Sequence, residues 1–340
     1  MANNRIFYAC HVVAISKTGH INTDTPQFEV MKGVQSVGIS TNITLEQVFE
    51  LGQVQLYSNE EQLAEVEVTI EKIIDGEKLL YLQSVGEIGK TNLVAATNSI
   101  CDVYVGIFPD STSSISGVTR DQTLMCSGMS LSSVNYNYTV DGNATEAVTL
   151  KGNNKFWSAS TYGVIGTSPN TLFGTQGGPT SFPIDGTDSP VSGIVRRHRF
   201  DMTNSIIPPE VCSQSGPVVG ASGLQSVSVS ADFGREDQFQ LGQFGPYNRY
   251  ATFPFEVSSE FEVYSTKGDL IAISGFGTAS ANRQIVIKDL AGTVINLGTK
   301  NRLTSVSHTG GDTGGGNATI NYSYSTFNDF LVNGGGTYWS

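Results

Sequence analysis

The chain has 340 residues, a length that suggests two or three domains. Hydrophobic residues make up 39% of it and charged residues only 15%, with 38 glycines and 13 tyrosines, so the composition excludes a disordered chain and favours many short strands joined by turns. The net charge of −12 argues against a protein that grips nucleic-acid phosphates with clustered basic side chains, although DNA could still slide past an acidic wall.

The N-terminal part of the chain carries a strand pattern followed by two weak helix patterns. Residues 6–13 are rich in β-branched and aromatic side chains, which predicts a strand. Leu45–Leu51 follows Thr44 and favours a short helix, and residues 59–63 favour another turn of helix. Neither segment is long enough to be a stable helix without tertiary contacts.

The next segment gives the clearest strand signal in the chain. Glu65–Glu71 alternates strictly, with Val66, Val68 and Ile70 on one face and polar residues on the other, as in a half-buried strand. Asp75-Gly76 then indicates a hairpin-type turn before the apolar run at residues 79–82.

Further along, Cys101–Phe108 predicts an apolar strand that ends at Pro109. Residues 134–140 alternate again, meet Asp141-Gly142, and are followed by a second strand pattern at residues 144–150. This arrangement predicts a β-hairpin.

The composition changes between Ser158 and Pro190, where Gly, Ser, Thr and Pro dominate without a strand period. A segment of this kind is typical of a linker or a surface arm. It divides the chain into a first β domain at residues 1–157, a linker or arm at 158–192 and a second β domain at 193–340.

The most specific feature is an internal repeat. Residues 33–57 match residues 223–247 at a constant offset of 190, with 11 identities in 25 positions, against one or two expected by chance from roughly average composition. The shared motif residues are Gln35, Ser36, Val37, Phe49, Leu51, Gly52, Gln53 and Tyr57 in the first copy, and Gln225, Ser226, Val227, Phe239, Leu241, Gly242, Gln243 and Tyr247 in the second. The sequence therefore predicts a duplicated β domain.

Two further matches extend the repeat. After a one-residue slip, residues 66–68 align with residues 255–257. Near the end of each unit, Val134–Tyr138 resembles Ile320–Tyr324.

No pattern in the sequence indicates catalysis or metal binding. The four histidines, His11, His20, His198 and His308, have no metal-ligand spacing, and no nucleophile elbow, P-loop or dinucleotide fingerprint occurs. The glycine-rich segment around Asp312 is better explained as a hairpin tip than as a calcium loop. We therefore expect no enzyme activity, no catalytic or metal-ligating residue and no cofactor.

The cysteines and the one basic cluster also favour structural roles. Cys10, Cys101, Cys126 and Cys212 are widely spaced, which predicts free and mostly buried thiols, with a disulfide as the minor alternative. Arg196, Arg197 and Arg199 surround His198, and three basic residues in so short a segment are usually solvated or paired.

The order of motifs between Val34 and Leu82 resembles that of the tail tube proteins of long-tailed bacteriophages, including those with contractile tails. The resemblance is carried by Gln35-Ser36-Val37, the block Phe49–Gln53 with Tyr57, and the strand at 65–71 followed by Ile74-Asp75-Gly76. The later hairpin at residues 132–150, with Asp141-Gly142 and Glu146, is similar to another part of such proteins. The match covers most of residues 1–157 and, more weakly, 193–340.

The resemblance implies an all-β fold with minor helix, in which two tandem β-sandwich or barrel-like tail-tube domains contribute strands to a β-barrel shared between subunits. It implies a virion protein, made in the host cytoplasm, whose rings stack into a tube that conducts DNA during ejection without binding it specifically. A closed ring would cover the strand edges. The lumen would be acidic, and Glu65, Glu67, Thr69 and Glu71 are the residues expected to face it.

The duplication favours three chains per pseudo-hexameric ring, with six chains as the alternative. The implied partners are other copies of the chain and, beyond them, sheath, tail terminator and baseplate proteins, with no membrane. The alternative functions are another tail component of the same fold, such as a baseplate hub or distal tail protein, and a surface-adhesion β-sandwich. The last would normally carry a secretion signal, which residues 1–5 do not show.

Overall fold

The computed structural model describes residues 11–17, 28–86, 97–108, 122–159, 193–214, 223–274, 277–278, 281–310 and 316–334. The fold is all-β, as predicted, with 58% strand and 6% helix among the described residues. The strands are β1 (His11–Lys17), β2 (Phe28–Val30), β3 (Val34–Asn42), β4 (Leu45–Phe49), β5 (Leu56–Glu61), β6 (Glu65–Ile73), β7 (Ile100–Ile107), β8 (Gln122–Thr139), β9 (Thr145–Gly152), β10 (Asn154–Ala159), β11 (Leu224–Asp232), β12 (Arg235–Gln238), β13 (Asn248–Ala251), β14 (Glu256–Tyr264), β15 (Ile273–Ser274), β16 (Gly277–Thr278), β17 (Val286–Lys288), β18 (Val294–Asn296), β19 (Arg302–Thr309), β20 (Thr319–Phe327) and β21 (Leu331–Asn333). The helices are α1 (Leu80–Val85), the 3-10 helix η3 (Arg197–Arg199) and α3 (Pro209–Cys212).

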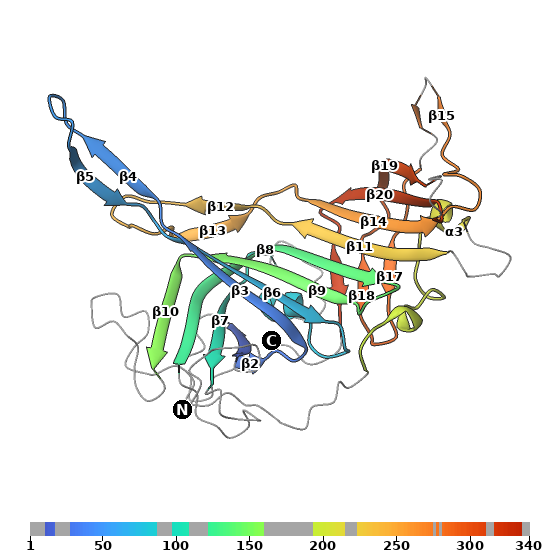
Figure 1. Cartoon of the computed structure of the whole chain (residues 1–340), viewed down its shortest axis with the longest axis horizontal. Coiled ribbons are helices and arrows are strands. Elements are labelled where there is room, and N and C mark those ends of the chain that lie inside the picture. Colours follow the sequence, from blue (N-terminus) through green and yellow to red (C-terminus); the bar gives the residue numbers. More distant parts are fainter. Residues whose placement is uncertain are drawn as a thin grey trace.

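One antiparallel run of strands crosses the whole molecule, and we call it the long sheet. Its strand order is β3-β6-β9-β8-β11-β14-β20-β19. The N-terminal half of β8 leaves this run and pairs with β7 on one side and β10 on the other, while β1 and β2 continue outward from β7. Figure 1 shows these strands turning away from the long sheet, so that β8 belongs to two layers.

Strict alternation gives the long sheet one apolar and one polar face, as the pattern at residues 65–71 predicted. Val66, Val68 and Ile70 of β6 are all at most 1% exposed. Tyr136 of β8 and Phe261 of β14 lie in the same continuous core, which spans both halves of the chain. The opposite face carries short polar side chains and carboxylates.

Helix α1 replaces the hairpin expected after Asp75-Gly76. The buried carboxylate of Glu146 accepts hydrogen bonds from the backbone N–H groups of Leu80 and Tyr81, at 2.6 and 3.0 Å, and so satisfies the start of the helix. Gly86 ends it in the left-handed conformation, with φ of 76°. The hairpin prediction was wrong because Glu146, far away in the sequence, stabilises this helix.

The two short helices expected at residues 45–51 and 59–63 are also wrong. Both segments are strands, β4 and β5, and they pair antiparallel with each other, Leu45 lying opposite Glu61. They extend β3 and β6 beyond the long sheet as one hairpin (Figure 1). Cross-strand pairing therefore overrides a weak local helix preference.

The strand ladders correct both extensions of the repeat. Thr41 lies opposite Val66 and its counterpart Ala231 lies opposite Val257, so Val66 corresponds to Val257 and not to Phe255. Strand β20 pairs with β14 as β9 pairs with β6, so residues 320–324 occupy the place of β9 and not that of residues 134–138. Alternating polar and apolar residues look alike after a shift of two, which made the wrong alignments plausible.

Of the expected linker, residues 160–192 lie outside the described residues, and Ser158 and Ala159 belong to β10. Residues 193–214 then join the two halves. Val195 exchanges backbone hydrogen bonds with Ile74 and Ala144, and Phe200 forms a β-bridge with Asp289 in the second half.

Candidate assembly surfaces

The described residues contain no cluster of three or more His, Cys, Asp or Glu side chains that could hold a metal ion. Burial lowers the pKa of His11 in β1, and it raises the pKa of the buried Cys126 thiol to about 12. His20, Cys10 and Asp312 lie outside the described residues. Within the described part of the chain, no helix is long and apolar enough to cross a membrane.

The residues expected to face a lumen lie together on the polar face of the long sheet. Glu65, Glu67, Thr69 and Glu71 alternate along β6 with the buried apolar residues. Lys151 of β9 contacts two of them, its Nζ lying 3.2 Å from Glu65 and 3.7 Å from Glu67. The hydrogen bond to Glu65 raises the pKa of Lys151.

The second half of the chain presents a matching acidic row. Glu256, Glu260 and Glu262 alternate along β14 with buried residues. The strands between the two rows, β9, β8 and β11, show mainly serine, threonine and asparagine on this face: Thr145, Thr149, Ser133, Asn135, Asn137, Ser226, Ser228 and Ser230. The polar face thus combines uncharged short side chains with two rows of carboxylates.

The motif residues at the beginning of each repeat form the same local structure. Gly33 and Gly223 have positive φ, and Nε2 of Gln35 and of Gln225 donates to their respective carbonyls. A β-bulge follows in both ladders, and the next serine donates from Oγ to a glutamate of the neighbouring strand: Ser36 to Glu71, and Ser226 to Glu262.

The remaining motif residues lie in two protruding hairpins. The first hairpin is β4–β5 and the second is β12–β13, and Figure 1 shows both extending from the long sheet toward the same side. At each tip the residue after a positive-φ glycine donates its N–H to the carbonyl three residues earlier: Gln53 to Glu50, and Gln243 to Gln240. Gly52 and Gly242 supply the left-handed conformation that this turn needs.

Both hairpins expose large apolar side chains, most of all at their tips. Leu51 is 103% exposed and its counterpart Leu241 is 104% exposed. Phe49 and Tyr57 of the first hairpin are more than half exposed, as are the corresponding side chains of the second, Phe239 and Tyr247. An apolar surface concentrated on paired projections indicates a contact surface for another protein.

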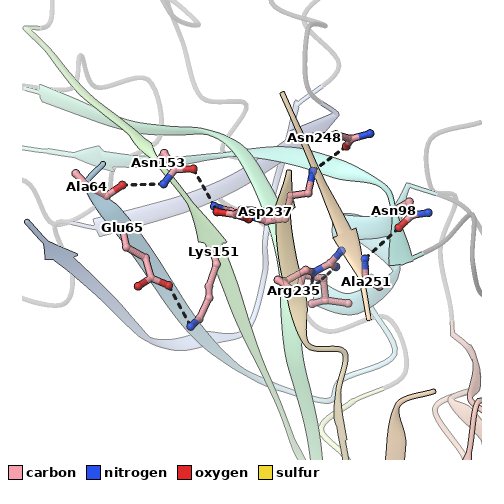
Figure 2. A network of polar contacts seen from close by, with 11 residues as sticks. Ala64, Glu65, Asn98, Lys151, Asn153, Arg235, Asp237, Asn248 and Ala251 are labelled. Carbon is pink, nitrogen blue, oxygen red and sulfur yellow. Dashed lines mark hydrogen bonds and ion pairs between the residues drawn. The ribbon is translucent and has the colours of Figure 1, made fainter. Parts of the chain in front are cut away.

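The base of the second hairpin rests on the first half of the chain (Figure 2). Arg249 forms an ion pair with Asp237 and donates from Nη2 to Oδ1 of Asn153 at 2.8 Å. Arg235 donates to the carbonyl of Leu131 in β8, and the N–H of Ala251 donates to Asn98. The base of this hairpin is therefore fixed to the first half, although its tip is exposed.

The outer edges of the long sheet are its third notable surface. Within the described part of the chain, β3 pairs only with β6 and β19 pairs only with β20. Val37 and Ile39 on β3 and Val306 on β19 are partly exposed although they pack against the core. An uncovered strand edge presents backbone donors and acceptors to another chain.

The basic cluster is mostly exposed and partly paired. Nε of Arg196 donates to Oδ1 of Asn143 at 2.9 Å, and Arg197 and His198 are exposed on η3. Residues 197–199 of this segment form the 3-10 helix η3.

The internal repeat contained the residues that form the hairpin tips, and the alternating pattern contained the acidic strand β6. No sequence pattern indicated the two sheet edges, the contacts of the buried Glu146 with α1 or the contacts of Arg249. Edges and long-range contacts have no local signal, because they depend on which strands become neighbours.

No protein-family model matches the sequence, and no curated protein matches it. Among solved structures, three chains with low similarity come from injection particles. A chain of the anti-feeding prophage baseplate is 11% identical with a TM-score of 0.32, and the match covers 47% of this chain and 99% of that one. A chain of the anti-feeding prophage tube-terminating cap is 10% identical with a TM-score of 0.33, and the match covers 47% of this chain and 94% of that one. A chain of the sheath–tube complex of the extracellular contractile injection system PVC is 15% identical with a TM-score of 0.32, and the match covers 46% of this chain and 93% of that one. At these scores the likeness by itself assigns no function.

Proposed function

We propose that this chain is a structural subunit of a phage-type tail tube, which assembles with copies of itself into stacked rings. The observation that carries the proposal is the pair of hairpins with fully exposed leucines at matching tips, Leu51 and Leu241. A leucine exposed on a projecting turn contributes nothing to the core and lowers solubility, so its use is explained by a contact with another subunit. Two such hairpins on one side suit the face-to-face stacking of rings.

The same proposal includes duplication of one tube domain. It is supported by matching details that folding alone does not require: the bulges beginning at Val34 and Leu224, the Gln35 and Gln225 side-chain bonds, and the two tip turns. With two domains per chain, three chains close a pseudo-hexameric ring. A ring of six chains, with the second domain outside, is the alternative.

The polar face of the long sheet is the surface proposed to line the lumen. Its carboxylate rows on β6 and β14 repel DNA phosphates. The basic Lys151 on this face is paired with Glu65 and Glu67, and the serine, threonine and asparagine side chains carry no charge that would hold a phosphate. DNA would therefore pass without specific binding. No catalytic role or cofactor is part of the proposal.

The proposed location is the virion tail, with sheath, tail terminator and baseplate proteins as neighbours in the assembled particle. A baseplate hub or distal tail protein of the same fold is the second candidate, and a surface adhesion module is the third. Among these, only a tube protein requires unlimited stacking of identical rings.

Negative-stain electron microscopy of the purified protein tests the proposal. We expect long hollow tubes, and a reconstruction should show both domains lining the lumen. Single rings that do not stack would favour a baseplate or distal tail protein. A uniform monomer at high protein concentration would refute assembly altogether, and a lumen lined by only one of the two domains would refute the three-chain ring.

A further inference from the structure

The two halves of the chain are joined inside the long sheet by one strand pair, β8 with β11. This junction is an antiparallel ladder in which Ser133 lies opposite Asp232, Asn135 opposite Ser230 and Asn137 opposite Ser228. The sheet therefore passes from the first half to the second without an interruption.

The outer strands of the long sheet are the unjoined counterparts of these two strands. Strand β3 corresponds to β11, because each carries a bulge at the same place in its ladder, after Val34 or Leu224. Strand β19 corresponds to β8, because β8 has a bulge after Leu131 against β9 and β19 has one after Leu303 against β20. The long sheet therefore has a β8-like strand, β19, at one edge and a β11-like strand, β3, at the other edge.

Corresponding apolar residues are more deeply buried at the internal junction than at the two outer edges. Val227 and Val229 of β11 are each 1% exposed at the junction, whereas their counterparts Val37 and Ile39 are partly exposed. Val134 of β8 is 1% exposed, and its counterpart Val306 is partly exposed.

The difference is largest just beyond the paired residues. Phe233 is completely buried, donates its N–H to the carbonyl of Ser132 at 2.9 Å and stacks on Tyr81. Its counterpart Ile43 is 56% exposed. An apolar residue that is buried at the internal junction is therefore left in water at the free edge.

We propose that β19 of one copy pairs antiparallel with β3 of a second copy, in the register that β8 and β11 have within one chain. This inference rests on the proposed self-assembly and specifies its contact. The expected opposite pairs are Ser305 with Asn42, Val306 with Thr41, Ser307 with Ser40, His308 with Ile39 and Thr309 with Gly38. Because the two edges are different surfaces, the contact is head-to-tail and can close a ring.

The side chains suit this register. It places Val306 and Ile39 on the core face and Ser307 and Ser40 on the polar face, whereas a shift of one residue would reverse one strand's faces. Strand β3 contains no charged residue and no proline, the usual features that protect an exposed edge from pairing. Its sequence therefore leaves the edge open to another strand.

Cysteine crosslinking of the full-length chain tests the register. The matched variant is Ser40→Cys with Ser307→Cys, and the shifted control is Ser40→Cys with Ser305→Cys; all three serines are exposed. Side chains directly opposite each other have Cβ atoms about 5 Å apart and diagonal neighbours about 7 Å, while a disulfide needs about 4 Å. We expect the matched variant to form linked multimers at least about tenfold faster than the control under mild oxidation.

Strands β3 and β19 are at opposite ends of the long sheet, so a link between them joins different chains. Each single-cysteine variant controls for links through native thiols. Equal rates, a faster shifted pair, or no linked multimers from the matched variant would overturn the register.

A second substitution, made in the matched cysteine pair, tests the burial argument. Adding Ile43→Glu to the matched pair should reduce crosslinking at least about tenfold, because a carboxylate would enter an apolar contact. The control is Ile273→Glu, since Ile273 is 78% exposed on β15. Crosslinking by the Ile43→Glu variant within about twofold of that control would contradict the proposal.

Microscopy on the same samples separates this inference from the proposed tube. Matched links in rings that never stack would support the edge pairing and refute the tube. Long tubes without matched links would support the tube and refute the edge pairing.

Discussion

Replacing the two tip leucines should block ring stacking and leave folding intact. In Leu51→Ser with Leu241→Ser, both altered side chains are fully exposed, at 103% and 104%, so the free energy of unfolding should change by less than about 0.5 kcal/mol. If stacking covers both side chains, each contributes about 1.5 kcal/mol or more to the contact. The combined loss of about 3 kcal/mol corresponds to about a hundredfold higher critical concentration for tube formation.

The assay is light scattering against protein concentration, with electron microscopy of the scattering species and urea unfolding of the unassembled protein. Leu290→Ser is the matched control, because Leu290 is 58% exposed and lies between β17 and β18, away from both hairpins. A double variant that assembles at the same concentration as the control would refute the role assigned to the tips. Loss of assembly together with a lower urea midpoint would show a folding defect and equally refute the reasoning.

Three further outcomes follow from buried groups. Asp75→Ala should lower the free energy of unfolding, measured with urea, by about 3–5 kcal/mol, because it leaves the fully buried Lys72 ammonium without the carboxylate 2.7 Å away. A double variant with Lys72→Met that recovers none of this stability would contradict the reason given. Burial raises the pKa of Glu146 in the folded protein, so the folded state holds this proton more tightly than the unfolded state, and the free energy of unfolding should fall as pH rises from the ordinary glutamate pKa through the raised one. Glu146→Gln should flatten this part of a curve of stability against pH. An unchanged slope would contradict the assignment. Mass spectrometry after brief alkylation of native protein should find Cys212 modified well before Cys101, because the Cys101 thiol is buried and its pKa is raised by burial; equal labelling would contradict that burial.

Local sequence patterns predicted the main strands, but they did not predict helix α1 or strands β4 and β5. Glu65–Glu71 and the hairpin around Asp141-Gly142 formed as expected, because alternation and turn chemistry act over a few residues. Helix α1 was missed because it depends on Glu146, and the strands β4 and β5 were missed because only pairing with each other makes them strands. The lumen-facing role of Glu65, Glu67, Thr69 and Glu71 stays a prediction.

The sequence by itself determined that the protein is all-β, that Val66, Val68 and Ile70 face a core, and that residues 33–57 recur at 223–247, since alternation and repetition are written in residue order. Only the tertiary structure decided that β8 joins β11 and that β3 and β19 are left as edges. Register and neighbour choice depend on long-range backbone pairing, and a shift of two residues preserves every local pattern while changing every partner.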